Sequence, residues 1–232
     1  FTQQNRSVND IIAEHFPVSA SLGVLALFFA AVGGIIWGAI TALYRDRMAD
    51  YSIMFLVIIC VSVPSFVFAA LGQLAILQLN NLLGVSLLPV AGWGTVSHML
   101  VPALVLGLGT MAYLTRLMRS SMLEVADTDY IRTARAKGFA ERAVMFRHAL
   151  KNALIPLVTI FALDIPYIFA GSLYVELMFS WPGMGRLYYQ AALGRDYPLL
   201  MAILIIASLF TVMANLLADI AYGVLDPRVR FS

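Results

Sequence analysis

The sequence Asp129-Tyr-Ile-Arg-Thr-Ala-Arg-Ala-Lys-Gly138 lies at the centre of the one long charged stretch of this chain, residues 116–151. That stretch carries eight basic and four acidic side chains. Apolar segments long enough to cross a membrane flank it on both sides. The pattern predicts a folded, basic, water-exposed element between two membrane spans, where another protein has access to bind and pull.

The composition indicates that the solvent of this chain is largely lipid. Of its 232 residues 61% are hydrophobic and only 12% are charged, with a mean hydropathy of +0.87. Soluble domains carry about 25% charged residues, and a soluble globule of this length has no interior large enough for so much apolar surface. The net charge of +2 gives no reason to expect nucleic acid as a partner. Because the sequence opens at Phe1 rather than Met, we expect a missing N-terminal piece.

The long apolar segments predict an all-α polytopic membrane protein with about five transmembrane helices. A short amphipathic helix over residues 7–16 is expected on the membrane surface, ended by Pro17. The second span is expected to kink at Pro64. The five spans cover residues 18–44, 52–79, 98–118, 152–175 and 198–218.

The basic residues fix the orientation of these spans. Twelve of the fifteen fall on one side of the membrane, which the positive-inside rule makes cytoplasmic. The other three, Arg6, Arg186 and Arg195, fall outside. Residues 1–17 are then an external segment, residues 18–225 one transmembrane domain with a cytoplasmic loop at 119–151, and residues 226–232 a cytoplasmic tail.

The charged loop has the local signals of two short helices. Asp127 or Thr128 is suited to cap the first, and Gly138 is suited to end it in the left-handed conformation. A second helix is expected over residues 139–151, with one apolar stripe made of Phe139, Ala143, Phe146 and Leu150. Charge alone also fits a loop that merely rests on lipid head groups.

Small residues and one long loop are the remaining local features. The spacing of Gly34 and Gly38 either lets a neighbouring helix approach or reflects chance in a glycine-rich span. The pattern Gly107-x-Gly109-x-x-Ala112 imitates a dinucleotide fingerprint, but no strand precedes it, which favours close helix packing. Residues 176–197, which include Trp181-Pro-Gly-Met-Gly185, are expected to form a folded cap at the membrane interface.

Motifs for chemistry within this chain are missing from the sequence. It has no Walker-type phosphate loop and no Gly-x-Ser-x-Gly, and its three histidines are scattered over both predicted sides of the membrane. Cys60 lies in an apolar run and is interpreted as a small core residue. We therefore expect no enzyme activity, no metal site and no cofactor in this chain.

The order of residues resembles the membrane subunits of bacterial binding-protein-dependent ABC importers. Their cytoplasmic signature is Glu-Ala-Ala-x-x-x-Gly, and Ala134 and Gly138 fit its spacing, although Arg132 and Thr133 replace Glu and Ala. That departure matches the peptide branch of the family, and the resemblance covers nearly the whole chain, most like a B-type oligopeptide permease subunit. The matching pieces are Phe16-Pro-Val-Ser19, Ala134-Arg-Ala-Lys-Gly138, His148, Asn152-Ala153, Pro156, Trp181-Pro-Gly-Met-Gly185 and Leu225-Asp-Pro-Arg228.

The resemblance implies a type I ABC importer fold in the bacterial inner membrane, with six spans of which the first is absent here. It implies a C-type permease partner, two cytoplasmic ATPases that hold ATP and Mg, an extracellular binding protein and a peptide substrate. Nickel, glutathione and haem are alternative cargoes. The charged loop would dock on the ATPase as a coupling helix, with Ile131, Arg132, Ala134, Arg135, Ala136, Lys137 and Gly138 as its coupling residues.

Asp164 raises an alternative function. A carboxylate in mid-membrane costs at least ~2.5 kcal/mol, so it is expected to face a wet pathway or a bonding partner. It either lines the translocation pathway, as Gln73 and Asn215 are also candidates to do, or it is a buried acid bonded to a neighbouring helix. As a proton carrier it would instead make this chain an ion-coupled secondary transporter, in which the charged loop has no special purpose.

Overall fold

A computed structural model describes residues 6–158, 160 and 172–225 of the chain, and the regular elements in this part are all helices. They divide into two compact units. The first unit comprises residues 1–28, 63–107 and 164–216, and the second comprises residues 29–62, 108–163 and 217–232. The long helices α1, α4 and α11 contribute residues to both units.

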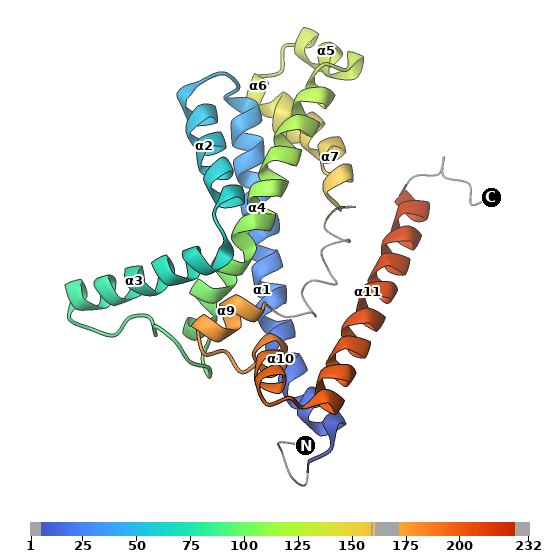
Figure 1. Ribbon diagram of the computed structural model, residues 1–232. Helices are drawn as coiled ribbons and strands as arrows, with labels where there is room; N and C mark the ends of the chain where they lie inside the picture. Colours follow the sequence, from blue (N-terminus) through green and yellow to red (C-terminus); the bar gives the residue numbers. More distant parts are fainter. Residues whose placement is uncertain (1–5, 159, 161–171, 226–232) are drawn as a thin grey trace. The chain divides into compact units, whose positions relative to one another are not determined.

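The helices follow one another in the order drawn in Figure 1. Helices α1, α3 and α4 are long and apolar enough to cross a membrane, whereas α2 and residues Tyr197–Met213 form shorter apolar helices. The prediction of an all-helical polytopic membrane protein is therefore confirmed for the described residues. The elements are α1 (Val8–Leu43), α2 (Met48–Ser62), α3 (Ser65–Leu83), α4 (Val96–Ala126), α5 (Asp129–Ala136), α6 (Glu141–Ala143), the π-helix η1 (Val144–Ala149), α7 (Leu150–Ala153), α9 (Leu173–Met178), α10 (Met184–Leu193) and α11 (Tyr197–Leu225).

Helix α1 continues through Pro17, so the prediction of a separate surface helix ended by that proline is wrong. Proline removes one backbone donor and crowds the preceding turn. Packing holds the helix on both sides of this defect. Before it, Ile11 and Ile12 are buried in an apolar cluster of the first unit. After it, the Trp181 indole Nε1 donates to the Val18 carbonyl over 3.2 Å.

Pro64 separates two helices rather than kinking one, so the predicted continuous span over residues 52–79 is also wrong. Helix α2 ends at Ser62 and α3 begins at Ser65, with Pro64 extended at φ −60° and ψ 145°. The residue before a proline is pushed away from the helical region, and the proline itself has no N–H to bond back. Together these effects favour a full break.

The other spans agree with the sequence where they are described. The predicted third span lies within α4, and the predicted fifth span lies within α11. Of the predicted fourth span, residues 159 and 161–171, which include Asp164, lie outside the described residues. The tail from residue 226 also lies outside them.

Close packing between helices explains the Gly34 and Gly38 pair and the first glycine of the second small-residue pattern. A Cβ on Gly38 would lie 2.7 Å from the Thr115 carbonyl oxygen, and one on Gly34 would lie 2.5 Å from the Leu114 Cβ. In the first unit, a Cβ on Gly107 would lie 2.5 Å from the Ala26 carbonyl oxygen. Such distances leave no room for a side chain, so close packing is confirmed at Gly34, Gly38 and Gly107, whereas a Cβ on Gly109 would meet nothing within 4 Å.

The second unit has an apolar core that reaches the charged loop. Its buried residues come from α1, α4, α5, η1 and α7. Figure 1 shows α5 and α6 at the end of α4, with η1 and α7 following them along the chain. The core members include Ala39, Ala42, Met118, Met122, Ile131, Ala134, Val144, Met145 and Ala149.

Candidate functional site

Helix α5 is the predicted short helix of the charged loop. It runs from Asp129 to Ala136 with Thr128 at its N-cap, although the Thr128 hydroxyl bonds the Val125 carbonyl rather than the helix. At its end Gly138 has φ +83°, and its N–H donates to the Arg135 carbonyl over 2.9 Å. The predicted helix and its left-handed glycine ending are confirmed.

One side of α5 is anchored in the core of the second unit. Ile131 is fully buried and Ala134 is 7% exposed. Both belong to the same apolar cluster as Met118 and Met122 of α4 and Val144 of η1. An isolated helix of this length is marginal in water, so this packing is what holds α5 in place.

The other side of α5 is open. Arg132, Ala136, Lys137 and Gly138 are exposed, and the Arg132 side chain keeps 70% of its surface while it pairs loosely with Asp129 at 3.5 Å. Exposed pairs of this kind contribute little stability and rearrange easily. This surface therefore offers cationic donors and small residues to a partner at little cost.

Arg135 differs from the other predicted coupling residues, because its guanidinium already has partners within the chain. Its Nη2 and Nε bond the Glu141 carboxylate over 2.7 and 3.1 Å, and its Nη1 donates to the Ala126 carbonyl over 3.0 Å. The hydrogen bond from Arg135 lowers the pKa of the Glu141 carboxyl. Arg135 therefore ties the end of α4 to the segment that follows α5.

The predicted helix over residues 139–151 is wrong in register. It is a short α-turn, then the π-helix η1, then α7. Each π turn takes in one more residue than an α turn, which rotates the following side chains. Val144, Met145 and Ala149 are buried, whereas Phe139 and Phe146 of the predicted stripe are 46% and 48% exposed.

Two side-chain bonds fasten this segment to the rest of the second unit. The Asn152 amide donates to the Tyr130 hydroxyl of α5 over 2.7 Å. The Arg142 guanidinium donates to the Tyr44 hydroxyl over 2.9 Å. Neither bond has a signal in the sequence, because the partners are distant along the chain.

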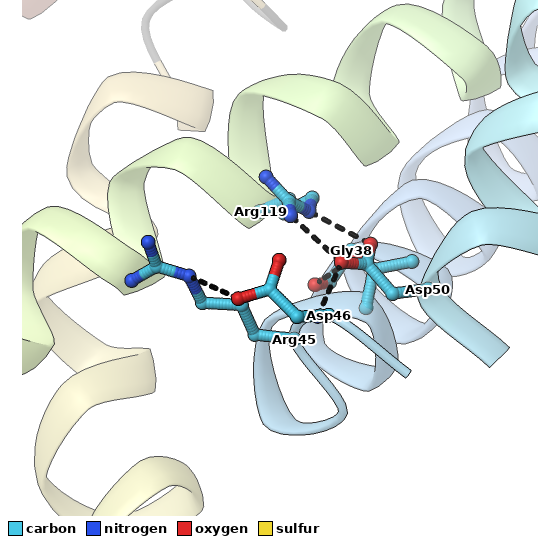
Figure 2. A network of polar contacts seen from close by, with 6 residues as sticks. Gly38, Arg45, Asp46, Asp50 and Arg119 are labelled. Carbon is cyan, nitrogen blue, oxygen red and sulfur yellow. Dashed lines mark hydrogen bonds and ion pairs between the residues drawn. The ribbon is translucent and has the colours of Figure 1, made fainter. Parts of the chain in front are cut away.

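Arg119 is a functional candidate whose environment sequence reasoning missed. It lies in the charged stretch, where we expected water, but only 26% of its side chain is exposed and it forms an ion pair with the buried Asp50 (Figure 2). Asp50 lies in the first turn of α2, just before the predicted second span. Because Asp50 lies close to the basic Arg45 and Arg47 in the sequence, it looks like part of a solvated turn.

In the first unit the predicted folded cap is confirmed, and a buried carboxylate organises it. Glu176 of α9 is fully buried. It accepts bonds from the Ser19 hydroxyl over 2.6 Å and from the Arg186 N–H over 3.0 Å. A Cβ on Gly183 would lie 2.7 Å from the Glu176 Cδ, which explains one glycine of the Trp-Pro-Gly-Met-Gly sequence. Burial raises the pKa of the Glu176 carboxyl despite these donors.

The structure describes two of the three pathway candidates, Gln73 and Asn215. The Gln73 amide donates to the Met178 carbonyl over 2.7 Å and to the Val90 carbonyl at 3.5 Å, so it joins α3 to the cap. Asn215 is exposed on α11. Asp164 lies outside the described residues, and for all three a place on the pathway stays a prediction.

Residues that could hold a metal do not gather in the part of the chain described here, where the structure has no cluster of three or more His, Cys, Asp or Glu side chains. The charged groups of the second unit instead pair with one another or are exposed, several of them on α5. The site is thus suited to protein contact.

The sequence matches one family over most of its length. Residues 34–231 match the model of the binding-protein-dependent transport system inner membrane component. The chain belongs to this family. It is therefore a multi-pass inner-membrane component of an ABC importer, and the family is one of transport components rather than catalytic subunits.

Curated relatives carry the same assignment. The chain is 39% identical to the dipeptide transport permease DppB of Bacillus subtilis (strain 168), over 97% of this chain and 71% of that protein. It is 40% identical to the oligopeptide permease AppB of the same organism, over 97% and 72%. It is 38% identical to the oligopeptide permease OppB of Escherichia coli (strain K12), over 100% and 74%.

Solved structures of lower identity share the fold. A structure of the MetNI methionine ABC transporter in an inward-facing conformation matches with a TM-score of 0.71 and 16% identity, covering 93% of this chain and 96% of that one. An amino acid ABC transporter solved with histidines matches with a TM-score of 0.64 and 15% identity, over 91% and 92%. The predicted type I importer fold is confirmed.

Proposed function

We propose that this importer subunit forms half of a peptide translocation pathway and that α5, with Lys137 and Gly138, is its contact with a cytoplasmic ATPase. The relatives named above are oligopeptide and dipeptide permeases, which supports a peptide cargo. ATP and Mg are then held by the ATPase subunits. A second permease subunit of the C-type and an extracellular binding protein complete the assembly.

One observation carries this proposal, the division of α5 into two sides. Ile131 and Ala134 are buried in the core, whereas Arg132, Ala136 and Lys137 are exposed. A loop that only rests on lipid head groups needs cations but no anchored helix. An anchored helix with an open basic side transmits a push from a bound protein to α4 and η1.

The orientation follows from the same argument. If α5 meets a cytoplasmic ATPase, the charged loop and the C-terminal tail lie in the cytoplasm, while the cap made by α9 and α10 lies outside. The bias of basic residues supports this assignment. The cap then faces the extracellular binding protein.

Gly138 provides the test. Its φ of +83° costs a non-glycine residue about 1–2 kcal/mol, and no atom lies within 4 Å of its added Cβ. Gly84 matches it, with φ +67° and open space, but lies in the first unit. Each is changed to Val in the complete importer, reconstituted with both permeases, the ATPases and the binding protein. Peptide uptake and peptide-stimulated ATP hydrolysis are then measured.

We expect Gly138→Val to abolish most uptake and most stimulated hydrolysis, and Gly84→Val to change both little. Unchanged uptake and hydrolysis in Gly138→Val would contradict the proposal. Peptide uptake by this chain alone in liposomes, driven by a proton gradient and lost in Asp164→Asn, would replace it with an ion-coupled transporter.

A further inference from the structure

Asp50 and Arg119 form a two-pronged ion pair between α2 and α4. The Arg119 Nε donates to the Asp50 Oδ1 over 2.8 Å, and its Nη2 donates to the Asp50 Oδ2 over 2.7 Å. Figure 2 shows the two parallel bonds. Such a fork fixes the angle between the two groups as well as their distance, which a single bond does not.

The same carboxylate also organises the turn that precedes α2. The Asp46 N–H donates to the Asp50 Oδ2 over 3.0 Å, and Asp46 has the left-handed φ of +61°. Asp50 sits in the first turn of α2, where a negative charge complements the helix dipole. The Asp50 carboxylate thus joins the start of α2 to the preceding turn through the Asp46 N–H and to α4 through the Arg119 guanidinium.

The ion pair is a polar link between α2 and the rest of the second unit, and no described residue of α2 belongs to the apolar core of that unit. The core cluster draws residues from α1, α4, α5, η1 and α7, and no α2 residue is among those described in it. Within α2 the described buried residues are Asp50 and Val57. The position of α2 on this core therefore depends strongly on the ion pair.

Arg119 lies on the part of α4 that carries the coupling helix. Its neighbours Met118 and Met122 are fully buried and share the core with Ile131 and Ala134 of α5. Met118 also packs near Gly38 of α1, where an added Cβ would lie 2.5 Å from the Met118 Cβ. A displacement of α5 thus reaches the helical turn of α4 from which Arg119 extends to α2.

Stability alone does not account for such a pair. A buried ion pair has to overcome the loss of hydration of both charges, and apolar residues of similar size often serve as well or better. What the fork adds is a stiff and directional connection. Lipid-facing apolar contacts, which slide more easily, do not provide it.

We propose that Asp50 and Arg119 are positioning residues that make α2 move together with α5 during the transport cycle. This inference rests on the proposed function, because it concerns the movement that the ATPase imposes on α5. The fork holds α2 at a fixed distance and angle to α4 while α5, anchored on α4, is displaced.

The test uses two variants, Arg119→Lys and the double variant Asp50→Asn with Arg119→Gln, and one matched control in the complete importer. Arg119→Lys keeps the charge and loses the fork. Asp50→Asn removes the charge of the acid, and combining it with Arg119→Gln leaves no unpaired buried charge that would prevent folding. The control is Asp46→Asn, which tolerates the left-handed backbone and keeps its N–H bond to Asp50. It removes an exposed pair with Arg45 at 3.3 Å and a charge attraction to Arg119 that is weaker than that of Asp50.

Two quantities are measured for each variant. The first is peptide uptake per ATP hydrolysed. The second is the distance between spin labels on Met48 of α2 and Thr133 of α5, both exposed and both in the second unit, with and without a non-hydrolysable ATP analogue. A residue that served stability alone would lower the amount of assembled importer without changing how the label distance responds to nucleotide.

We expect the label distance to stay constant on nucleotide binding in the unmodified importer and in Asp46→Asn. In Arg119→Lys and in the double variant it should change, and uptake per ATP should fall at least fivefold. A constant distance and normal uptake per ATP in the assembled double variant would overturn the inference while the proposed function stands. The proposed function is tested by Gly138→Val, and the outcome of that experiment does not depend on the Asp50 and Arg119 variants.

Discussion

Replacing Ile131 with alanine tests whether α5 is anchored as the structure indicates. The side chain is fully buried among Met118, Met122 and Val144. Truncating a buried isoleucine to alanine costs about 2–5 kcal/mol, and a site with no exposure belongs in the middle of that range or above. Because an eight-residue helix has little stability of its own, most of this cost should appear as local opening of α5.

Amide hydrogen exchange of residues 129–136 measures that opening directly. A loss of about 3 kcal/mol corresponds to roughly a hundredfold faster exchange, since each 1.4 kcal/mol is a factor of about ten. The control Thr133→Ala changes an exposed side chain of the same helix and favours the helix slightly, so its exchange should not accelerate.

The expected consequence of Ile131→Ala is an importer whose ATPases run with little peptide uptake per ATP. Exchange of residues 129–136 that is no faster than in the control would show that Ile131 does not anchor α5. The core of the second unit would then not transmit force from α5.

Three further changes test other parts of the structure. Gly183→Ala should lower the thermal stability of the importer, because the new methyl would lie 2.7 Å from the Glu176 Cδ, whereas Gly109→Ala meets open space and should not. Since burial raises the pKa of Glu176, the folded cap holds this proton more tightly than the unfolded chain does. Thermal stability should therefore fall as the pH rises above 4.5, the ordinary pKa of a glutamate, and Glu176→Gln should remove that dependence. Identical pH profiles of thermal stability in Glu176→Gln and in the unmodified importer would argue against this explanation. The lowered pKa of Glu141 works in the opposite sense, because its bond to Arg135 is lost as the pH falls through that pKa. Arg135→Lys also disturbs the bond to the Ala126 carbonyl, which does not titrate. The difference in amide exchange near α5 between Arg135→Lys and the unmodified protein should hence become smaller in acid, and a difference of unchanged size would contradict the pairing with Glu141.

Sequence reasoning succeeded where a signal is local. Gly138 marks the end of α5 because a left-handed residue after a helix is nearly always glycine. Charge-free stretches located α4 and α11 because lipid excludes charge over a known length. The spacing of Gly34 and Gly38 indicated close packing, although only the structure identified Leu114 and Thr115 as the contacts.

It failed where the outcome depends on distant partners. Pro17 looked like a helix end until Trp181 and the apolar cluster around Ile11 were seen to hold the helix through it. Ser19 and Glu176 are 157 residues apart, and Asp50 and Arg119 are 69 apart, so no pattern in the sequence joins them. The π-helix η1 shifted the buried face because tertiary packing, rather than α-helical periodicity, selected Val144 and Met145.

The most direct measurement of the central claim is a cross-link from the exposed side of α5. A cysteine replaces Lys137, Cys60 is changed to alanine, and the complete importer is treated with a short bifunctional reagent in the presence and absence of an ATP analogue. We predict a cross-link to a cytoplasmic ATPase whose yield changes with nucleotide. An actively transporting importer in which this cysteine reacts with water-soluble reagents but joins no ATPase under either condition would contradict the account.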